Sequence, residues 1–423
     1  FPTFDSSPMS IRLLILLAIS SPVIAQDQYN YDESKIPTYT LPDPLLKLDG
    51  TKVTTAAQWP ARRAEILALF EDHVYGSTPK AAANTKLTAK VTLTIPDFLD
   101  GKATLREVDL SFEDHTINLL LVTPNASDNP APAFLGLNFN GNHTIHPDPR
   151  ISLPSSWVWN DRKGKGPVTD NKASTKSRGI AATRWPLELI IDQGFALATI
   201  YYGDIDPDFD DGFQNGVHAT FGKPDKDDWG SIGTWAWGLS RALDFLVEDT
   251  KVDGAKVAVF GHSRLGKTSL WAGATDPRFA LTISNDSGCG GAALSRRAIG
   301  ETVKRINTSF PHWFSDSFQQ YNGNESALPV DQHMLVALLA PRPVYIGSAE
   351  DDPWADPNGE FLSGKHADPV YALFDKKGLG VDKQPEVDTP VGHTIGYHIR
   401  KGKHDVTTYD WTQYLTFAKR HLR

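Results

Sequence analysis

The stretch of sequence that decides the fold is KVAVFGHSRLGK, residues 256–267. Its first part, Val257–Phe260, is short and wholly apolar, as is typical of a parallel strand buried on both faces. Gly261 to Gly266 then form a glycine-flanked turn, and Thr268–Ala274 are expected to continue as a helix. A serine in a sharp turn between a buried strand and a helix is typical of a nucleophile elbow. Ser263 is therefore the candidate nucleophile.

The local chemistry of this turn favours a covalent step but leaves other interpretations open. The backbone N–H of Arg264 and the N-terminus of the helix would point at a developing oxyanion. Ser263 could instead be a simple helix N-cap. Residues 261–268 also match the GxxxxGKT spacing of a phosphate-binding loop. Bulky His262 and Arg264 argue against that loop, because they would crowd a backbone that must wrap a phosphate.

The strands around this stretch predict the fold class. Short apolar segments alternate with helical stretches such as 228–248, which favours a doubly wound, mostly parallel α/β sheet between two helical layers. An amphipathic helix is predicted over 61–75, and antiparallel strands over 87–95, 103–112 and 116–122. The segments predicted as parallel strands are 133–139, 195–201, 257–260, 280–284 and 344–347.

A serine needs a histidine base, and position along the chain favours His404. In α/β-hydrolase folds the order is serine, acid, histidine, with the histidine after the last strand. Residues 393–400 form a plausible last strand, and His404 follows it. His393 and His398 are rivals, but His398 lies inside the predicted strand and is expected to face a neighbouring element.

The carboxylate that orients the base has several candidates. Glu350, Asp351 and Asp352 follow the strand predicted over 343–348, and Asp286 follows the strand before it. A carboxylate is needed to hold the imidazole and to stabilise its charged form. Any acid after a strand can also be an ordinary solvated turn, so the residues alone leave the choice open.

Composition excludes several classes of protein. Net charge is 42 − 51 = −9 over 423 residues, without the basic surplus of a nucleic-acid-binding protein. The chain has a single cysteine, Cys289, so it forms no internal disulfide, and a zinc site built on cysteines is not expected. We expect no nucleic-acid partner, no metal and no cofactor.

The N-terminal residues predict export. Met9 and Arg12 precede an apolar run, Leu13–Ile19, and Ala25 ends a segment typical of a cleavage site. That run is shorter than the ~18 residues of a membrane span, so no membrane partner is expected. We predict a signal peptide cut after Ala25, with extraneous residues before Met9, and a secreted or periplasmic mature protein.

The mature chain, residues 26–423, is predicted to be a single catalytic domain and a monomer. Residues 26–60 are rich in Pro and Asp and are expected to form an extended arm. Residues 142–186 are a long polar insertion. Such insertions usually lie above the carboxyl edge of the strands, where ligands bind, so we expect this one over the active site.

Several motifs together resemble one known family. GHSRLGK, NDSGCGGAALSRRAIGE, FPHWF, DDPWADPNGEF and KHDVTTYDW, in this order, are similar to the bacterial glucuronoyl esterases of carbohydrate esterase family 15. The resemblance spans roughly residues 195–411 and accounts for the late position of Gly266. It differs from the fungal branch, which has a disulfide-forming cysteine where this chain has His262.

The resemblance implies an α/β-hydrolase fold and a secreted serine esterase. Its expected substrate is the ester between (4-O-methyl-)glucuronic acid of glucuronoxylan and the alcohols of lignin, cleaved through an acyl-enzyme without a cofactor. An acetyl or feruloyl esterase on the same fold, or a carbohydrate-binding protein without activity, stay as alternatives.

The resemblance also assigns roles by motif. It makes Ser263 the nucleophile, His404 the base and Asp352 the acid, with Asp286 at the place where fungal members carry their acid. Arg264 is similar to an arginine that stabilises the oxyanion. Three further positions match residues that contact the sugar: Lys267, Glu301 and Trp354.

Overall fold

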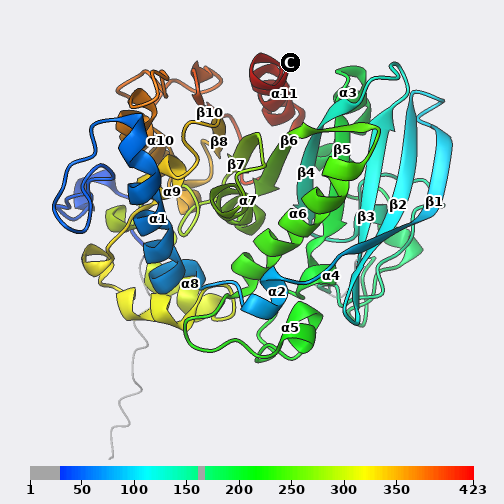
Figure 1. Cartoon of the computed structure of the whole chain (residues 1–423), viewed down its shortest axis with the longest axis horizontal. Helices are drawn as coiled ribbons and strands as arrows, with labels where there is room; N and C mark the ends of the chain where they lie inside the picture. The colour runs from blue at the N-terminus through cyan, green and yellow to red at the C-terminus, as the bar shows by residue number, and fades with distance from the viewer. Residues whose placement is uncertain (1–28, 161–166) are drawn as a thin grey trace, which may run out of the picture.

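The computed structural model describes residues 29–160 and 167–423, and its centre is one twisted ten-stranded sheet (Figure 1). The order across the sheet is β1-β2-β3-β5-β4-β6-β7-β8-β10-β9. The strands are β1 (Thr88–Phe98), β2 (Ala103–Phe112), β3 (His115–Pro124), β4 (Ala131–Asn138), β5 (Ala196–Tyr201), β6 (Val252–His262), β7 (Leu281–Asn285), β8 (Val344–Ala349), β9 (Val391–Gly392) and β10 (Ile395–Arg400).

The sheet has an antiparallel and a parallel part. Strands β1, β2, β3 and β5 pair antiparallel, whereas β5, β4, β6, β7, β8 and β10 run parallel. The two-residue β9 adds an antiparallel edge beside β10. This confirms the predicted mostly parallel sheet with antiparallel N-terminal strands.

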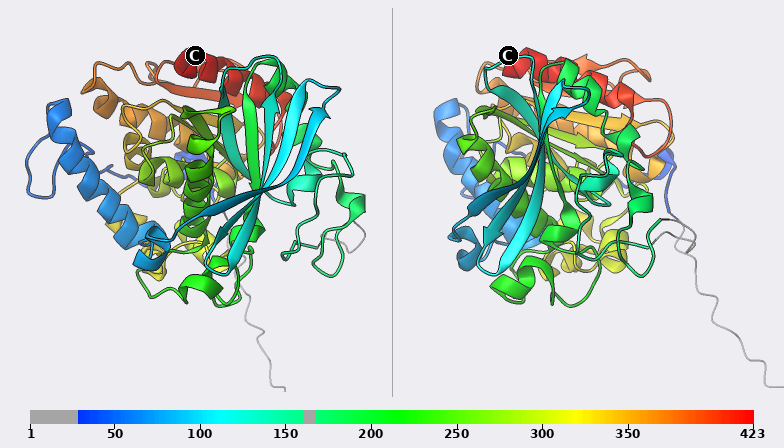
Figure 2. Two further views of the ribbon diagram at one scale, coloured as in Figure 1. Left: turned by 45° about the vertical axis from the view of Figure 1, so that its right-hand side comes forward. Right: turned by 90° about the vertical axis from the view of Figure 1, so that its right-hand side faces the viewer.

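Helices cover both faces of the sheet and form the expected three layers (Figures 1 and 2). On one face lie α1 (Trp59–Phe70), α6 (Ser231–Glu248), α7 (Arg264–Thr275), α9 (Gln332–Ala337) and α10 (Pro357–Ala372), and on the other α3 (Leu187–Asp192) and α11 (Thr408–Leu422). The remaining short helices are α2 (Lys80–Ala83), α4 (Tyr202–Ile205), α5 (Gly216–Phe221) and α8 (Val303–Ser309). Within residues 29–160 and 167–423, no helix is long and apolar enough to cross a membrane.

Strand β6 shows why an unbroken apolar run forms a central strand. Successive side chains point to opposite faces of a sheet. Val257 and Val259 join the core under α6 and α7, and Ala258 and Phe260 join the core under α11. A strand with helices on both sides therefore needs apolar residues at every position.

Several predicted boundaries differ from the structure. The helix predicted over 61–75 begins at Trp59, changes to a π-helical turn over Glu71–Tyr75, and ends at Gly76 with φ 77°. The helix after the elbow begins directly at Arg264. The strand expected from His393 begins at Ile395, because Gly392, with φ 113°, turns the chain between β9 and β10.

The segments outside this regular framework pack on it. The predicted signal peptide lies outside the described residues. The described part of the arm reaches the loop before α8, where Gly300 N–H donates to Asn30 O at 2.8 Å. In the insertion, Ser152 N–H donates to buried Glu107 of β2 at 2.7 Å, and its loops lie beside the antiparallel strands (Figure 2).

Candidate active site

Ser263 stands at a strained turn between β6 and α7. Its φ is 58° and its ψ is −129°, a region that non-glycine residues rarely occupy and that clusters at active sites. The Ser263 side chain makes no capping hydrogen bond, so the simple N-cap interpretation is not supported. A Cβ at Gly261 would collide with the carbonyl of Leu265, and one at Gly266 would lie 3.0 Å from Ser287 Cβ. The two glycines therefore permit the close contact of strand and helix.

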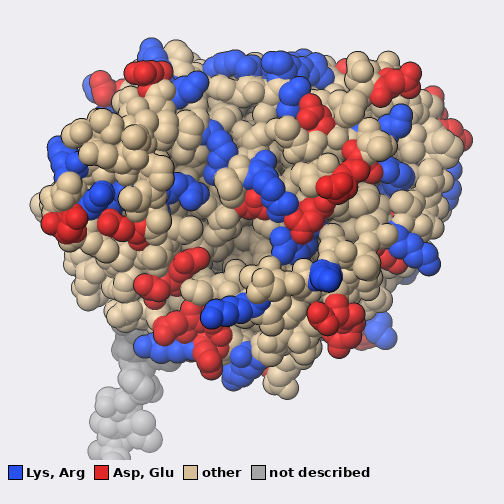
Figure 3. Space-filling model, viewed as in Figure 1, with Lys and Arg blue, Asp and Glu red and all other residues tan. Residues whose placement is uncertain are grey.

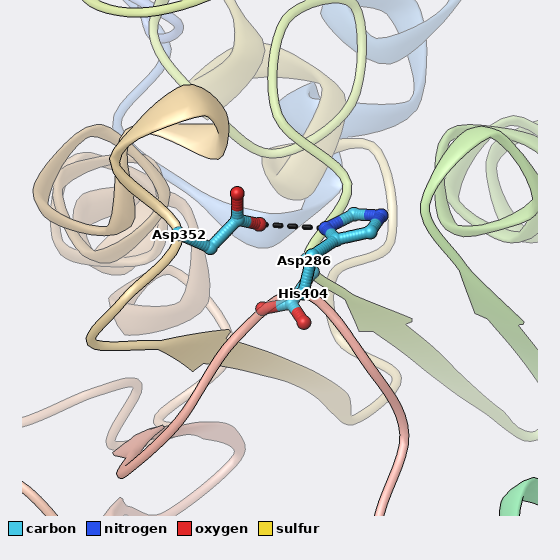
Figure 4. Close-up of side chains that lie close together, drawn as sticks. All are labelled: Asp286, Asp352 and His404. Atoms are coloured by element: carbon cyan, nitrogen blue, oxygen red, sulfur yellow. Dashed lines mark hydrogen bonds and ion pairs between the residues drawn. The ribbon is translucent and has the colours of Figure 1, made fainter.

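His404 and Asp352 lie beside this turn and are joined directly (Figure 4). The distance from His404 Nδ1 to Asp352 Oδ2 is 2.6 Å. Asp352 is buried and the His404 side chain is 39% exposed, so one ring edge faces the open side of the site. The rings of His404 and His262, the residue before Ser263, have centroids 4.5 Å apart. The predicted histidine and acid are thus in direct contact, next to the residue that precedes Ser263.

Asp286, the other predicted acid, lies close to the same histidine, but its carboxylate interacts with other residues. One carboxylate oxygen each of Asp286 and Asp352 and one ring nitrogen of His404 all lie within 4.8 Å of one another. Asp286 Oδ2 contacts Arg400 Nη2 at 3.4 Å and accepts from the Asp405 N–H at 3.3 Å. Burial, reinforced by the nearby Glu360 carboxylate, raises the pKa of Asp286 well above its ordinary value. A carboxyl that tends to keep its proton is a poor partner for an imidazolium.

These three residues are also the one group of metal-ligand type among the described residues. Two carboxylates and one imidazole would suit a divalent cation in composition. Their hydrogen bonds do not favour a metal site, because His404 Nδ1 already contacts Asp352 and Asp286 contacts Arg400. The arrangement is that of a histidine oriented by a carboxylate.

His262 provides a neutral neighbour for His404. Its Nδ1 lies 2.6 Å from Asn285 Oδ1, and the side chain is buried. Burial, together with the adjacent His404, lowers the pKa of His262 far below its usual range. His262 therefore stays uncharged next to His404.

Arg264 is fixed as a cation next to Ser263. Its Nη1 forms an ion pair with Asp208, and its guanidinium lies over the Trp313 ring, 4.7 Å from the centroid. Burial alone would raise the pKa of Asp208, but Arg264 and His312 outweigh it and hold that pKa well below its ordinary value. Arg264 Nε is buried without a hydrogen-bond partner among the described residues. One N–H donor is therefore free for an anion.

The three predicted sugar contacts are also brought together. Lys267 Nζ donates to the Ser287 carbonyl at 2.5 Å and lies 3.4 Å from Glu301 Oε2. The Glu301 N–H donates to the Trp354 carbonyl at 3.0 Å. The Trp354 ring meets the ring of Tyr29, from the N-terminal arm, edge-on at 4.9 Å. A cation, a carboxylate and an indole thus line one side of the site.

The two rival histidines do not reach the site. His398 is buried in β10, with Nε2 2.9 Å from Asp410 Oδ1, as its position inside the strand predicted. His393 is exposed in the turn before β10. Cys289 is a buried free thiol.

Sequence reasoning missed two buried acids that support the site. Glu360 falls within DDPWADPNGEF, one of the motifs that carried the family resemblance, and Asp208 lies in the stretch YYGDIDPDFDDGF, residues 201–213. Neither acid follows a strand directly. Asp208 also accepts hydrogen bonds from Trp313 Nε1 at 2.7 Å and His312 Nε2 at 3.0 Å. Their only signal in the sequence was a carboxylate among aromatic and glycine residues.

Glu360 ties two active-site loops together. Its Oε1 accepts from the N–H groups of Ser287 at 2.7 Å and Gly288 at 2.9 Å, and its Oε2 accepts from Ser348 Oγ at 2.6 Å. Burial raises the pKa of Glu360 to about 7. Because Ser287 follows Asp286 and its carbonyl holds Lys267, Glu360 supports both the acid side and the sugar side of the site.

Known proteins resemble this chain along its whole length. A family model described as glucuronyl esterase of fungi matches residues 180–375. The carbohydrate esterase MZ0003, from an unknown prokaryotic organism, is 52% identical, with 97% of this chain and 98% of that protein covered. A solved glucuronoyl esterase from Solibacter usitatus is 46% identical with a TM-score of 0.86, over 92% of this chain and all of that one.

A fungal relative is more distant. The 4-O-methyl-glucuronoyl methylesterase of Schizophyllum commune is 29% identical, with 91% of this chain and 86% of that protein covered. The similarity therefore includes the strands, the elbow and the loops that carry Asp286, Asp352 and His404.

Proposed function

The chain belongs to carbohydrate esterase family 15, the glucuronoyl esterases, and on that premise we propose that Ser263, His404 and Asp352 form its catalytic triad. Members of this family are ester hydrolases, and this chain is one. The observation that carries the proposal is the 2.6 Å contact between His404 and Asp352 next to a serine held at a positive φ.

The proposed reaction follows from these positions. His404 takes the proton of Ser263 as Oγ attacks the glucuronoyl carbonyl, and Asp352 stabilises the imidazolium. The tetrahedral intermediate then collapses: the carbon–oxygen bond to the alcohol breaks, and His404 gives its proton to the leaving oxygen. Water, activated by His404, cleaves the acyl-enzyme and frees the glucuronic acid and Ser263.

The oxyanion is proposed to form next to Arg264. The proposed donors belong to Arg264, which directly follows Ser263: its Nε, which has no hydrogen-bond partner among the described residues, and its backbone N–H. Asp208 and the Trp313 ring fix the guanidinium before substrate arrives, so little reorganisation is needed as charge develops.

The glucuronoyl ring is proposed to lie against Lys267, Glu301 and Trp354. A lysine and a carboxylate can hold adjacent hydroxyls by charge-assisted hydrogen bonds. An indole offers an apolar face and one N–H donor. The ester expected in nature links (4-O-methyl-)glucuronic acid of glucuronoxylan to an alcohol of lignin.

Ser263→Ala tests the proposal. We expect kcat on benzyl glucuronate to fall by about 10⁴-fold or more, because removal of a triad nucleophile typically has an effect of this size. The melting temperature should stay close to that of the wild type. Retained activity in the folded variant would contradict the assignment. Acetylated xylan in parallel separates a glucuronoyl esterase from an acetyl esterase.

Export is proposed from the segment between Met9 and Ala25. Its charged start, apolar run and small residues at the end support a cleaved secretory signal. N-terminal sequencing of the protein recovered outside the cytoplasm should begin at Gln26. A protein that keeps Met9 after expression in its host would contradict this proposal.

A further inference from the structure

A second polar cavity lies away from Ser263, between the insertion and the antiparallel strands. It has a volume of about 360 Å³. Its lining comes from β1, β2, β3, the loop after β4, α4 and the insertion, and includes Thr92, Asp109, Asn118, Asn142, Ser155 and Asp204. The catalytic residues and the proposed sugar contacts are not part of this lining. It is a separate site.

The cavity opens on the same edge of the sheet as the active site. Asp204 follows the carboxyl end of β5, just as Ser263 follows that of β6. Asn118 lies in the first half of β3, which runs antiparallel to β5 and so starts at this edge. Strand β5 lies two strand spacings from β6, and β2 lies four. Because neighbouring strands are about 5 Å apart, the cavity lies about 10–20 Å along the edge from β6, the strand that leads to Ser263.

The lining is built to hold neutral hydroxyl groups. Asn142 Nδ2 donates to the Asn118 carbonyl at 2.9 Å, and Asn118 Nδ2 donates to Asp109 Oδ1 at 3.0 Å, which fixes both amides. Ser156 Oγ donates to Asp204 Oδ1 at 2.5 Å, which fixes this carboxyl as well. Amides and carboxylates in fixed positions can accept from and donate to the hydroxyls of a sugar.

Charge excludes an anionic ligand. The lining holds two carboxylates, Asp109 and Asp204, and neither Lys nor Arg belongs to it. Burial raises the pKa of Asp204 to about 6, and above that pH its charge adds to the repulsion of a uronate or a phosphate, in contrast to the main site with Arg264 and Lys267. The three-residue group of metal-ligand type found in the described chain is the one around His404, so this cavity lacks such a set.

Aromatic side chains connect the cavity to the active site. Phe209 adjoins Asp208, the partner of Arg264, and its ring lies 4.6 Å from that of Trp157. Trp157 meets Trp159 at 4.9 Å, and Trp159 is 47% exposed. Ser155, in the cavity lining, is two residues from Trp157. Exposed indole faces are suited to the apolar faces of sugar rings.

We propose that this cavity, with Trp157 and Trp159, is a distal subsite for the neutral pentose units of the polysaccharide that carries the glucuronoyl ester. The inference rests on the proposed function and specifies how the polymer is held. The main site binds the charged uronoyl unit, and the insertion binds neutral units of the same chain. Small esters gain nothing from the subsite because they do not reach it.

The first test measures binding of xylohexaose, a neutral oligosaccharide, to the full-length Ser263→Ala protein by calorimetry. We expect saturable binding that weakens about tenfold in Asp109→Ala, because that variant removes a hydrogen bond to a charged group. Ser155→Trp, which fills the cavity from an exposed position, should abolish it. Matched controls are Asp128→Ala and Ser127→Trp in the exposed turn before β4, which should bind as the parent does.

The second test is kinetic and uses otherwise wild-type enzyme. Ser155→Trp and Trp159→Ala should raise KM on a polymeric glucuronoxylan ester several-fold and leave kcat/KM on benzyl glucuronate unchanged. No xylohexaose binding at millimolar concentration, or variants equal to their controls on the polymer, would overturn the subsite. So would tight binding of calcium, which would make the cavity a cation site. A failed proposed function looks different, since then wild-type enzyme would not cleave benzyl glucuronate.

Discussion

The parallel and the antiparallel half of the sheet place different features at the same edge of the sheet, the one where the parallel strands end. Beyond β6, the loops after β7, β8 and β10 supply Asp286, Asp352 and His404, which lie close together, with His404 hydrogen-bonded to Asp352 (Figure 4). Beyond β5, the edge is lined by strand starts and by an inserted segment, and it encloses a polar cavity. Chemistry requires fixed atoms, which loops between buried strands and helices provide. Recognition of a long substrate requires surface, which an insertion provides.

The two halves of the sheet also differ in the charged side chains that they place at this edge. The parallel half holds cations that each lie beside a carboxylate: buried Lys267 and Arg400, and partly buried Arg264. The antiparallel cavity has carboxylates alone among its charged residues. Elsewhere the face in Figure 3 mixes both signs, without a field of one sign. Local cations at the site, and not the net charge of −9, are therefore expected to attract a uronoyl group.

The largest effect within the parallel half should separate its two acids. Asp352→Asn should lower kcat by about 10³–10⁴-fold, because the amide favours the wrong tautomer of His404. Asp286→Asn should cost much less, about tenfold, because burial already favours its protonated form. Steady-state kinetics on benzyl glucuronate measures both.

Exposed Asp351→Asn is the matched control for this pair and should behave as the wild type. The opposite ranking, with Asp286→Asn crippling and Asp352→Asn harmless, would show that His404 uses the other acid.

A smaller effect should follow from releasing Arg264. Asp208→Asn removes the charge that pairs with the guanidinium and leaves a buried cation without its partner. We expect kcat to fall by about 10²-fold, the usual scale for loss of one oxyanion donor. Exposed Asp210→Asn controls for charge in the same loop. If kcat is unchanged in a folded Asp208→Asn enzyme, Arg264 does not depend on this ion pair.

The last expected effect is on the pH dependence of stability and not on catalysis. The Glu360 carboxyl ionises near 4.5 in the unfolded chain but near pH 7 in the fold. Between these values the folded state binds more protons, so stability falls as pH rises, by up to about 3 kcal/mol. Glu360→Gln keeps an acceptor for Ser287 and Gly288 and can donate to Ser348, but it does not titrate.

Chemical denaturation at pH 4.5 and pH 7.5 tests this. The wild type should lose more stability between the two than Glu360→Gln, and exposed Glu350→Gln should behave as the wild type. An identical pH dependence in both would mean that Glu360 is ionised throughout. Glu360→Ala should lose about 1–3 kcal/mol at either pH, because it leaves buried N–H groups unpaired.

The parts of the site that could be predicted are those marked by a pattern of neighbouring residues or by their order along the chain. Ser263 was recognisable because its turn, strand and helix are consecutive, and His404 because chain order places it after the last strand. Asp208 and Glu360 were missed for the opposite reason. Asp208 meets Arg264 across 56 residues, and Glu360 meets Ser287 across 73, with no local pattern to mark either pair.

By itself, the sequence determined the strand–turn–helix around Ser263 and the parallel sheet, because glycine sterics and apolar patterning act over a few residues. It also gives the chain order of the proposed catalytic residues. The tertiary structure decided which acid touches His404. Asp286 and Asp352 each follow a strand that ends at the same edge of the sheet. Only the side-by-side packing of β7, β8 and β10 sets the distance of each acid from His404 and its burial. It also created the distal cavity, since that surface is shared by β1–β3 and an insertion that no local rule brings together.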